Sequence, residues 1–291
     1  MSVRVRPLVP KTLLSVTFHT VLTGAIIILN KENYLGIAKK IMLKKLLILG
    51  SSLIVAGCVG QSDKEIPQLP DGAYKLEYVQ ITESGISSRE FRNQLKIYSN
   101  NRYMFAFMHP QIGVDAGAGL ANWNNGVMTE IPLFNHNGSV SGFKFDVTID
   151  QTNTGFTQSL VGLITEDGRS LDMIETWETA STQKSPYDGL WQRVISEENS
   201  DSEIFEIKMI GGGHFITMTR SEVESIIEKN FHFGNFKIMG NKQVAKKTIT
   251  SSDETQIGID EILSVGVVKD GLILNSVSDN GIEATSRYKK I

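Results

Sequence analysis

The sequence predicts a mainly β protein in which two small antiparallel barrels follow one another, preceded by an N-terminal hydrophobic signal segment. From about residue 69 onward, short runs of β-branched and aromatic residues are separated by Gly, Asn and Asp. Runs that turn roughly every 8–12 residues are typical of a barrel or a sandwich. Landmarks in the first half of this region recur in the second half, at offsets of 117, 112, 113 and 111 residues. We therefore expect two tandem domains, 69–182 and 186–291.

The composition is that of a globular protein. The chain has 291 residues, of which 41% are hydrophobic and 21% are charged, which argues against wholesale disorder and against a polytopic membrane protein. Its length allows two domains of roughly 100–200 residues each. It has one cysteine, which excludes intramolecular disulfides and a cysteine-rich zinc site.

Charge is distributed unevenly along the chain. Of the 29 basic residues, eight precede Cys58, whereas Glu32 is the only one of the 32 acidic residues to do so. Residues 58–291 therefore carry a net charge of about −10. An acidic body with no basic stripe does not attract a phosphate backbone, so no nucleic-acid partner is expected.

Residues 42–57 have the layout of a secretory signal peptide. Met42 is followed by two lysines, a short apolar run and then small residues that end at Gly57. The apolar run is too short to span a bilayer comfortably. The ending Val55-Ala56-Gly57-Cys58 resembles the lipobox of bacterial lipoproteins. The resemblance implies cleavage between Gly57 and Cys58 and attachment of a lipid to the Cys58 thiol.

An alternative interpretation makes Cys58 a small buried residue at the end of an ordinary helix. The polar residues that follow it, Val59-Gly60-Gln61-Ser62-Asp63-Lys64, favour a linker over 58–68 instead. Cys58 is far from Met1 for a signal peptide but normally placed from Met42. We therefore expect Met42 to be the physiological start and 1–41 to be an over-extended upstream segment; the alternative is a membrane helix over 12–29.

The lipid implies a membrane as partner. Two or more acyl chains make a stable anchor, whereas one chain binds only marginally. Val59, rather than Asp, follows Cys58, which resembles lipoproteins passed on to the outer membrane. The expected location is the bacterial cell envelope, lipid-anchored in the outer membrane. Export also suits a chain without further cysteines.

Alternation predicts the strands of the first unit. In the segment 102–108, Tyr103, Phe105 and Phe107 fall on one face of a strand. Turn signals such as Ser99-Asn100-Asn101 and Asn137-Gly138 tolerate a positive φ. The expected strands are Ala73–Ile81, Gln94–Tyr98, Arg102–Met108, Gly126–Ile131, Gly142–Ile149, Gln158–Thr165 and Leu171–Thr176.

The second unit repeats the same landmarks with one insertion. Gly72 corresponds to Gly189, Lys96 to Lys208 and Trp177 to Tyr288. The tetrapeptide Ser221-Glu222-Val223-Glu224 matches a capping box, and Val223, Ile226 and Ile227 follow helical spacing. These features predict a helix over 222–229 that covers one end of the second barrel.

Each unit resembles the small lipocalin-like domains of exported bacterial proteins. Gly189-Leu190-Trp191 matches their opening strand, and Gly72-Ala73-Tyr74 matches it with Tyr in place of Trp. The segment 117–123, followed by Thr129-Glu130, matches their Gly-rich strand, whereas the second copy has Lys246 or Lys247 in place of that pair. The resemblance implies eight-stranded barrels, whose interior is just filled or holds one small ligand.

No catalytic, metal or cofactor site is expected. The chain lacks a Gly-x-Ser-x-Gly elbow and an Asp-x-Asp-x-Asp-Gly loop, and its histidines are scattered. Gly211-Gly212-Gly213 is predicted to be a hairpin turn, since no helix and no Lys-Ser or Lys-Thr follows it. Glu175 and Glu178 are predicted to point outward around an inward Trp177. We expect no enzyme.

The aromatic face is the candidate ligand site. Tyr103, Phe105, Phe107 and Trp123 would line a cavity for a small apolar or amphipathic molecule, although such a stripe is also typical of plain core. The predicted function is a non-catalytic envelope lipoprotein that binds this ligand. The alternative is a structural or protein-interaction module with filled barrels.

Overall fold

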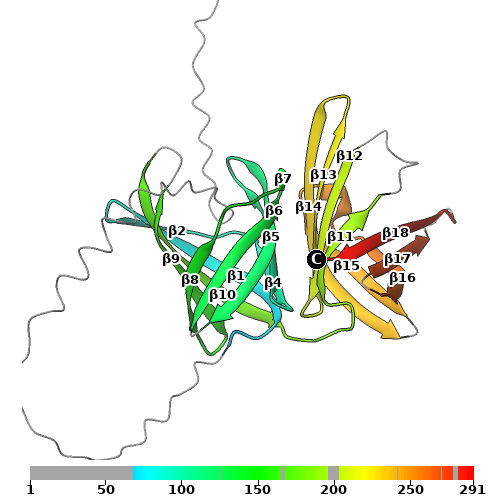
Figure 1. Ribbon diagram of the computed structural model, residues 1–291, viewed down its shortest axis with the longest axis horizontal. Coiled ribbons are helices and arrows are strands. Elements are labelled where there is room, and N and C mark those ends of the chain that lie inside the picture. The colour runs from blue at the N-terminus through cyan, green and yellow to red at the C-terminus, as the bar shows by residue number, and fades with distance from the viewer. Residues whose placement is uncertain are drawn as a thin grey trace, which may run out of the picture.

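The computed structural model describes residues 68–124, 126–164, 168–195, 203–240, 242–269, 271–277 and 281–291. This part of the chain folds almost entirely into strands that close into two antiparallel barrels of eight strands, which lie side by side in Figure 1. The predicted fold class is confirmed for these residues. The predicted signal peptide, Cys58 and nearly all of the linker lie outside the described residues.

Barrel 1 extends from Gly72 to Ser181. Its strands are β1 (Gly72–Glu83), β3 (Leu95–Ser99), β4 (Arg102–His109), β5 (Gly113–Asn124), β6 (Val127–Asn135), β8 (Phe145–Gln151), β9 (Gly155–Ile164) and β10 (Ser170–Ser181). Each pairs with the next in this order, and β10 pairs with β1 to close the ring. Barrel 1 also has two short strands that the sequence did not predict, β2 (Ile86–Glu90) and β7 (Gly138–Ser139). They pair with β1 and β6, respectively.

One strand position of barrel 1 is broken. Both β2 and β3 pair with β1, β2 along Val79–Glu83 and β3 along Gly72–Lys75. The residues between them, 91–94, belong to neither strand. Within this break, the backbone of Gln94 accepts a hydrogen bond from the amide of Leu76, which keeps the segment against the barrel wall.

Barrel 2 is a simple up-and-down barrel from Gly189 to Lys290. Its strands are β11 (Gly189–Val194), β12 (Glu203–Gly211), β13 (His214–Val223), β14 (Ile226–Gly240), β15 (Gln243–Ser251), β16 (Asp260–Val268), β17 (Gly271–Val277) and β18 (Glu283–Lys290). Pairing of β11 with β18 closes the ring, and a 3-10 turn at Glu254–Gln256 connects β15 to β16.

The same β-bulge marks both barrels as copies. In barrel 1 the register of β5 against β6 shifts between Ala118 and Gly119, and in barrel 2 that of β14 against β15 shifts between Phe233 and Gly234. A Cβ at Gly119 would lie 2.1 Å from the carbonyl oxygen of Ile131, and one at Gly234 would lie 1.9 Å from that of Lys247. Both positions therefore require glycine.

The helix predicted over 222–229 is wrong. Val223 pairs with Ile226 across a tight turn in the long hairpin of β13 and β14, which projects from barrel 2 in Figure 1. Glu224 and Ser225 form the turn, with φ of 50° and 68°. Pairing along ten positions of each strand outweighs the local capping-box signal. Val223, Ile226 and Ile227 are exposed.

The two barrels share an apolar interface. On β4, Met104 and Ala106 point away from the interior of barrel 1 and join a buried cluster with residues of barrel 2. The residues of barrel 2 in this cluster are Leu190, Ile207, Met209, Ile216, Met218, Phe231 and Phe233. Strands at this interface are therefore buried on both faces, which explains why Leu95–Ser99 has no exposed residue.

The predicted hairpin turn at Gly211-Gly212-Gly213 is confirmed, and it lies in the same interface. Gly212 and Gly213 have φ of 60° and 67° between β12 and β13. A Cβ at Gly212 would lie 2.3 Å from the amide nitrogen of Ala73 and 2.5 Å from the carbonyl oxygen of Ser181. The turn therefore needs glycine both for its conformation and for its close approach to barrel 1.

Candidate functional site

The aromatic residues predicted from the alternation gather inside barrel 1. Tyr103, Phe105 and Phe107 are buried in one cluster, and Trp123 packs against it while remaining partly exposed. Across from them, β5 carries Gly117 and Gly119, which pair with Phe105 and Tyr103. A Cβ at Gly117 would lie 2.8 Å from the Phe105 ring. The glycines of this strand thus leave room for the aromatic rings.

A charged network crosses this interior. The Lys96 ammonium lies 2.7 Å from a carboxylate oxygen of Glu130 and donates a 3.0 Å hydrogen bond to Gln158. The Tyr98 hydroxyl donates to the same Glu130 oxygen at 2.6 Å. Burial, followed by the nearby Glu130 carboxylate, raises the pKa of Tyr98 well above its usual value. Tyr98 therefore stays protonated and acts as a donor.

A second polar group lies inside barrel 1, and it includes Glu175. The prediction that Glu175 points outward is wrong, because it shares the inward face of β10 with Trp177 and accepts a 3.1 Å hydrogen bond from its indole. Glu178 does face outward. Asp115 is also buried, paired across the sheet with Phe107. The Arg92 guanidinium lies 5.0 Å from the centre of the Phe107 ring.

Burial is the main cause of the raised pKa of these two carboxyl groups. Burial raises the pKa of Asp115 to about 8, with Glu175 adding to the increase and Arg92 opposing it. Burial also raises the pKa of Glu175, against the effect of Lys96. Both groups are therefore poorly compensated in the folded protein, since a charge that is buried without a partner is costly.

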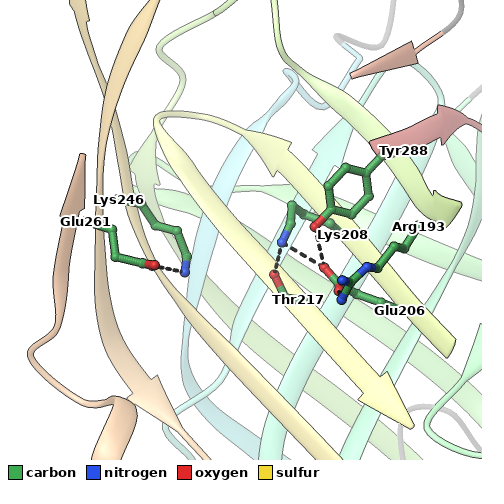
Figure 2. A network of polar contacts seen from close by, with 7 residues as sticks. All are labelled: Arg193, Glu206, Lys208, Thr217, Lys246, Glu261 and Tyr288. Atoms are coloured by element: carbon green, nitrogen blue, oxygen red, sulfur yellow. Dashed lines mark hydrogen bonds and ion pairs between the residues drawn. The ribbon is translucent and has the colours of Figure 1, made fainter. Parts of the chain in front are cut away.

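Barrel 2 has its own interior network, drawn in Figure 2. Glu206 receives the Lys208 ammonium at 3.0 Å, the Tyr288 hydroxyl at 2.7 Å and the Arg193 guanidinium at 3.1 Å. Lys208 also donates to the Thr217 hydroxyl at 3.0 Å. Three donors thus bind one carboxylate, and the charged groups of the network have their partners within it.

The protonation states in barrel 2 follow from this convergence. Burial alone would raise the pKa of Glu206, but Lys208, Tyr288 and Arg193 together lower it to about 2. Burial alone would likewise lower the pKa of Lys208, yet Glu206 raises it above its usual value. Both groups are therefore charged near neutral pH. Lys246, further round the barrel, pairs with Glu261.

The histidines support the turns and strand faces. The His109 ring accepts hydrogen bonds from the amides of Gln111 and Ile112, which fixes the β4–β5 turn. His214 contacts the carbonyl of Gly212 at 2.7 Å, and His232 packs edge-on against Phe215. Among the described residues, no group of three His, Cys, Asp or Glu side chains could hold a metal ion. In the same residues, no helix is long and apolar enough to cross a membrane.

Sequence reasoning missed the charged residues of both interiors. A usable signal was present, because Lys96 and Tyr98 alternate on one strand, as do Glu175 and Trp177, so each charge shares the face of an inward aromatic residue. Charged residues are mostly exposed in folded proteins, so this alternation alone does not predict that they are buried. Asp115 lies two residues before Gly117 on the Gly-rich strand and is on the same face.

No protein-family model matches the chain, and no significant match is found among curated proteins or solved structures.

Proposed function

We propose that this protein is a lipid-anchored lipoprotein of the bacterial cell envelope that binds a small apolar or amphipathic molecule inside a β-barrel. The observation that carries the anchor is the short apolar run that ends in Val55-Ala56-Gly57-Cys58, directly before an acidic body of two barrels. Acyl chains on Cys58 would hold this body at a membrane, and Val59 favours the outer one.

The proposed activity is binding rather than catalysis. Support comes from the closed barrel 1, whose interior combines a cluster of aromatic rings with a few buried polar side chains. Small-molecule sites are typically lined in this way, by apolar surface with a small number of placed polar groups. The proposed lining includes Tyr103, Phe105, Phe107 and Trp123.

Replacing Cys58 tests the anchor. The Cys58→Ser variant retains the shape of the side chain but removes the thiol that would receive the lipid. We expect the unaltered chain to sediment with membranes and to lose this association in Cys58→Ser, while mass spectrometry of the unaltered protein shows an acylated N-terminal peptide beginning at Cys58. Equal sedimentation of both proteins would refute the anchor.

Native mass spectrometry after gentle extraction tests the ligand. A co-purifying lipid or metabolite would identify the ligand class directly. If no extra mass is found and no thermal shift occurs across a panel of lipids, ligand binding is refuted.

A structural or interaction module is the second candidate, and barrel 2 supports it. Its interior combines a buried apolar cluster with the closed Glu206–Lys208 network. Such a filled barrel would act through its outer surface. Under this function both barrels remain without ligand in the experiment above, and the protein is recovered with a partner protein after crosslinking in whole cells.

A further inference from the structure

Four polar side chains of barrel 1, those of Arg92, Gln94, Asp115 and Glu175, come from neighbouring parts of its ring of strands. The strands β10, β1, β3, β4 and β5 are consecutive neighbours in the ring. Glu175 of β10 pairs with Val79, and Asp115 of β5 pairs with Phe107 of β4. Between them, the break before β3 places Arg92 against the Phe107 ring and Gln94 beside Leu76. The four side chains therefore form an arc around part of the interior.

This arc carries buried polar atoms that the described protein leaves without hydrogen-bond partners. They are Oε1 of Gln94, both carboxyl oxygens of Asp115, Oε1 of Glu175 and Nη1 of Arg92. Gln94, Asp115 and Glu175 are each at most 2% exposed. Buried polar groups are almost always paired, and leaving one unpaired costs about 1–3 kcal/mol. A concentration of such atoms at one place indicates a site that another molecule completes.

Most of the unpaired atoms are oxygens that can accept a hydrogen bond, the exception being Nη1 of Arg92. Lys96 is paired with Glu130, and the second guanidinium nitrogen of Arg92 donates to Glu90 at 2.6 Å. Nη1 of Arg92 is left without a partner, and Arg92 lowers the pKa of both Asp115 and Glu175, but both oxygens of Asp115 and Oε1 of Glu175 stay without a hydrogen bond. The Asp115 carboxyl group lies 3.8 Å from Nδ1 of His136. Burial and then Lys229 lower the pKa of His136 to about 4, so it is neutral near pH 7.

Barrel 2 lacks this arrangement at the matching positions. The register of β13 and β14 aligns Asn230 with Asp115, and that of β17 and β18 aligns Ser286 with Glu175. Asn230 accepts a hydrogen bond from Ser252, so its oxygen is satisfied within the barrel. At these matching positions, barrel 1 therefore has two buried carboxyl groups and barrel 2 has Asn230 and Ser286 instead.

We propose that barrel 1, and not barrel 2, binds a small amphipathic molecule through a protonated amine that lies between Asp115 and Glu175. This inference rests on the proposed ligand-binding function and specifies its barrel, its chemistry and its polar contacts. The amine would donate hydrogen bonds to the unpaired carboxyl oxygens, and its positive charge would favour the ionised form of both carboxyl groups. Phe105 and Phe107 would contact the apolar part of the ligand and add cation–π attraction.

The three tryptophans make a direct test possible. Trp177 bonds Glu175 in barrel 1, whereas Trp191 belongs to the apolar cluster of barrel 2. The full chain, kept in solution by an amphipathic polymer, is labelled with 5-fluorotryptophan and followed by fluorine NMR. Three water-soluble probes of equal chain length are titrated: n-hexylammonium, n-hexanol and n-hexanoate.

We expect n-hexylammonium to shift the Trp177 signal saturably and to leave the Trp191 signal in place. Its affinity should exceed that of n-hexanol by at least about tenfold, since charge-assisted hydrogen bonds are the stronger ones. n-Hexanoate should bind more weakly than n-hexanol, because the carboxyl groups repel it.

Two variants assign the contacts. Asp115→Asn and Glu175→Gln preserve side-chain size and should reduce the preference for n-hexylammonium over n-hexanol to about threefold or less. Glu178→Gln is the matched control, because Glu178 is an exposed carboxylate on the same strand as Glu175. It should leave the preference unchanged. Unaltered signals of Trp123 and Trp191 before any probe is added show that both barrels of each variant are folded.

The outcomes separate the inference from the proposed function. Equal binding of n-hexanol and n-hexylammonium at Trp177 overturns the amine and leaves the proposed function standing. A shift confined to Trp191 overturns the choice of barrel, again without affecting the function. If no probe moves either signal, the inference fails, and native mass spectrometry decides separately whether the ligand-binding function fails as well.

Discussion

The two barrels carry a lysine at the same place and pair it differently. Lys96 and Lys208 occupy matching positions on β3 and β12, and both point inward. In barrel 1 the partner is Glu130 on β6. In barrel 2 the position that corresponds to Glu130 is occupied by Lys246, which lies two residues before Thr248, the partner of the bulge glycine Gly234. Lys208 therefore pairs with Glu206, which lies on the same strand.

This difference shows how one architecture accommodates two interiors. A buried cation must have a partner, but the partner can come from any strand that reaches the same point in the barrel. Barrel 2 uses Arg193, Lys208 and Tyr288 to satisfy Glu206. Barrel 1 satisfies Lys96 and leaves Asp115 and Glu175 incompletely paired. In the described residues, the charged groups of one interior satisfy one another, and the other interior keeps buried polar atoms without hydrogen-bond partners.

The largest expected effect comes from breaking the closed network. Lys208→Met leaves the buried Glu206 carboxylate without its main partner, and we expect the free energy of unfolding to fall by about 3–5 kcal/mol. Urea denaturation followed by circular dichroism measures it. The double variant Glu206→Leu/Lys208→Met removes both charges and should recover most of the loss. A loss below about 1 kcal/mol in the single variant would contradict the assigned role.

The second largest loss of stability is expected from a change at the contact between the barrels. Gly212→Ala places a methyl group against the backbone of Ala73 and Ser181 at a positive φ, and we expect a loss of about 2–4 kcal/mol. Gly258→Ala is the control, with a φ of 85° and no atom within 4 Å of the added Cβ. It should cost only about 1 kcal/mol. Equal losses in the two variants, measured by urea denaturation, would show that the approach to barrel 1 is unimportant.

The barrels should respond to pH in opposite directions. The pKa of Asp115 is raised to about 8 by folding, so its contribution to stability is present below about pH 4 and is lost as the pH rises toward 8. The pKa of Glu206 is lowered to about 2, so its contribution is present above about pH 4 and is lost as the pH falls toward 2.

Substitution at Asp115 separates these contributions. Asp115→Asn should flatten the decline in stability between about pH 4 and 8 and raise the free energy of unfolding near pH 8 by about 1–3 kcal/mol. Urea titrations at several pH values measure both. The loss of stability at acid pH, which belongs to Glu206, should persist in this variant. A decline unchanged by the substitution would assign it to another group.

The smallest effect concerns two tight hairpin turns that lie at different places in the two barrels. Asn100 and Asn101 turn β3 into β4 with φ of 52° and 58°, whereas Glu224 and Ser225 hold a similar backbone in barrel 2. Tight turns with two positive φ values favour Asn-Gly. Glu224→Asn together with Ser225→Gly should therefore stabilise the protein by about 0.5–1 kcal/mol in urea denaturation. Destabilisation would mean that the original side chains have contacts of their own.

The strands of the first unit could be predicted because their pattern is local. Tyr103, Phe105 and Phe107 alternate with residues that face the other barrel, and Asn100-Asn101 marks the turn before them. The β13–β14 hairpin could not be predicted in this way. Ser221 and Glu224 fit a helix start, and only pairing of Val223 with Ile226 and of the residues beyond them favours the strand.

The candidate site likewise has one part that the sequence could predict and one part that it could not. Its aromatic part follows from alternation, but Asp115, Glu175 and Arg92 come from three separate segments of the chain. Only barrel closure places them inside. The burial of Met104 and Ala106 also depends on the second barrel, since the outer face of a lone barrel would be in water.

The sequence by itself determined that this is a duplicated chain of short antiparallel strands, because period-two alternation, turn residues and glycines at bulges act over a few neighbouring residues. The tertiary structure alone decided which charges are buried, which lysine pairs with which carboxylate, and that the two barrels share an apolar face. Those outcomes depend on the desolvation of side chains brought together from distant strands. The free-energy cost of burying a charge is set by all the groups around it in the folded protein.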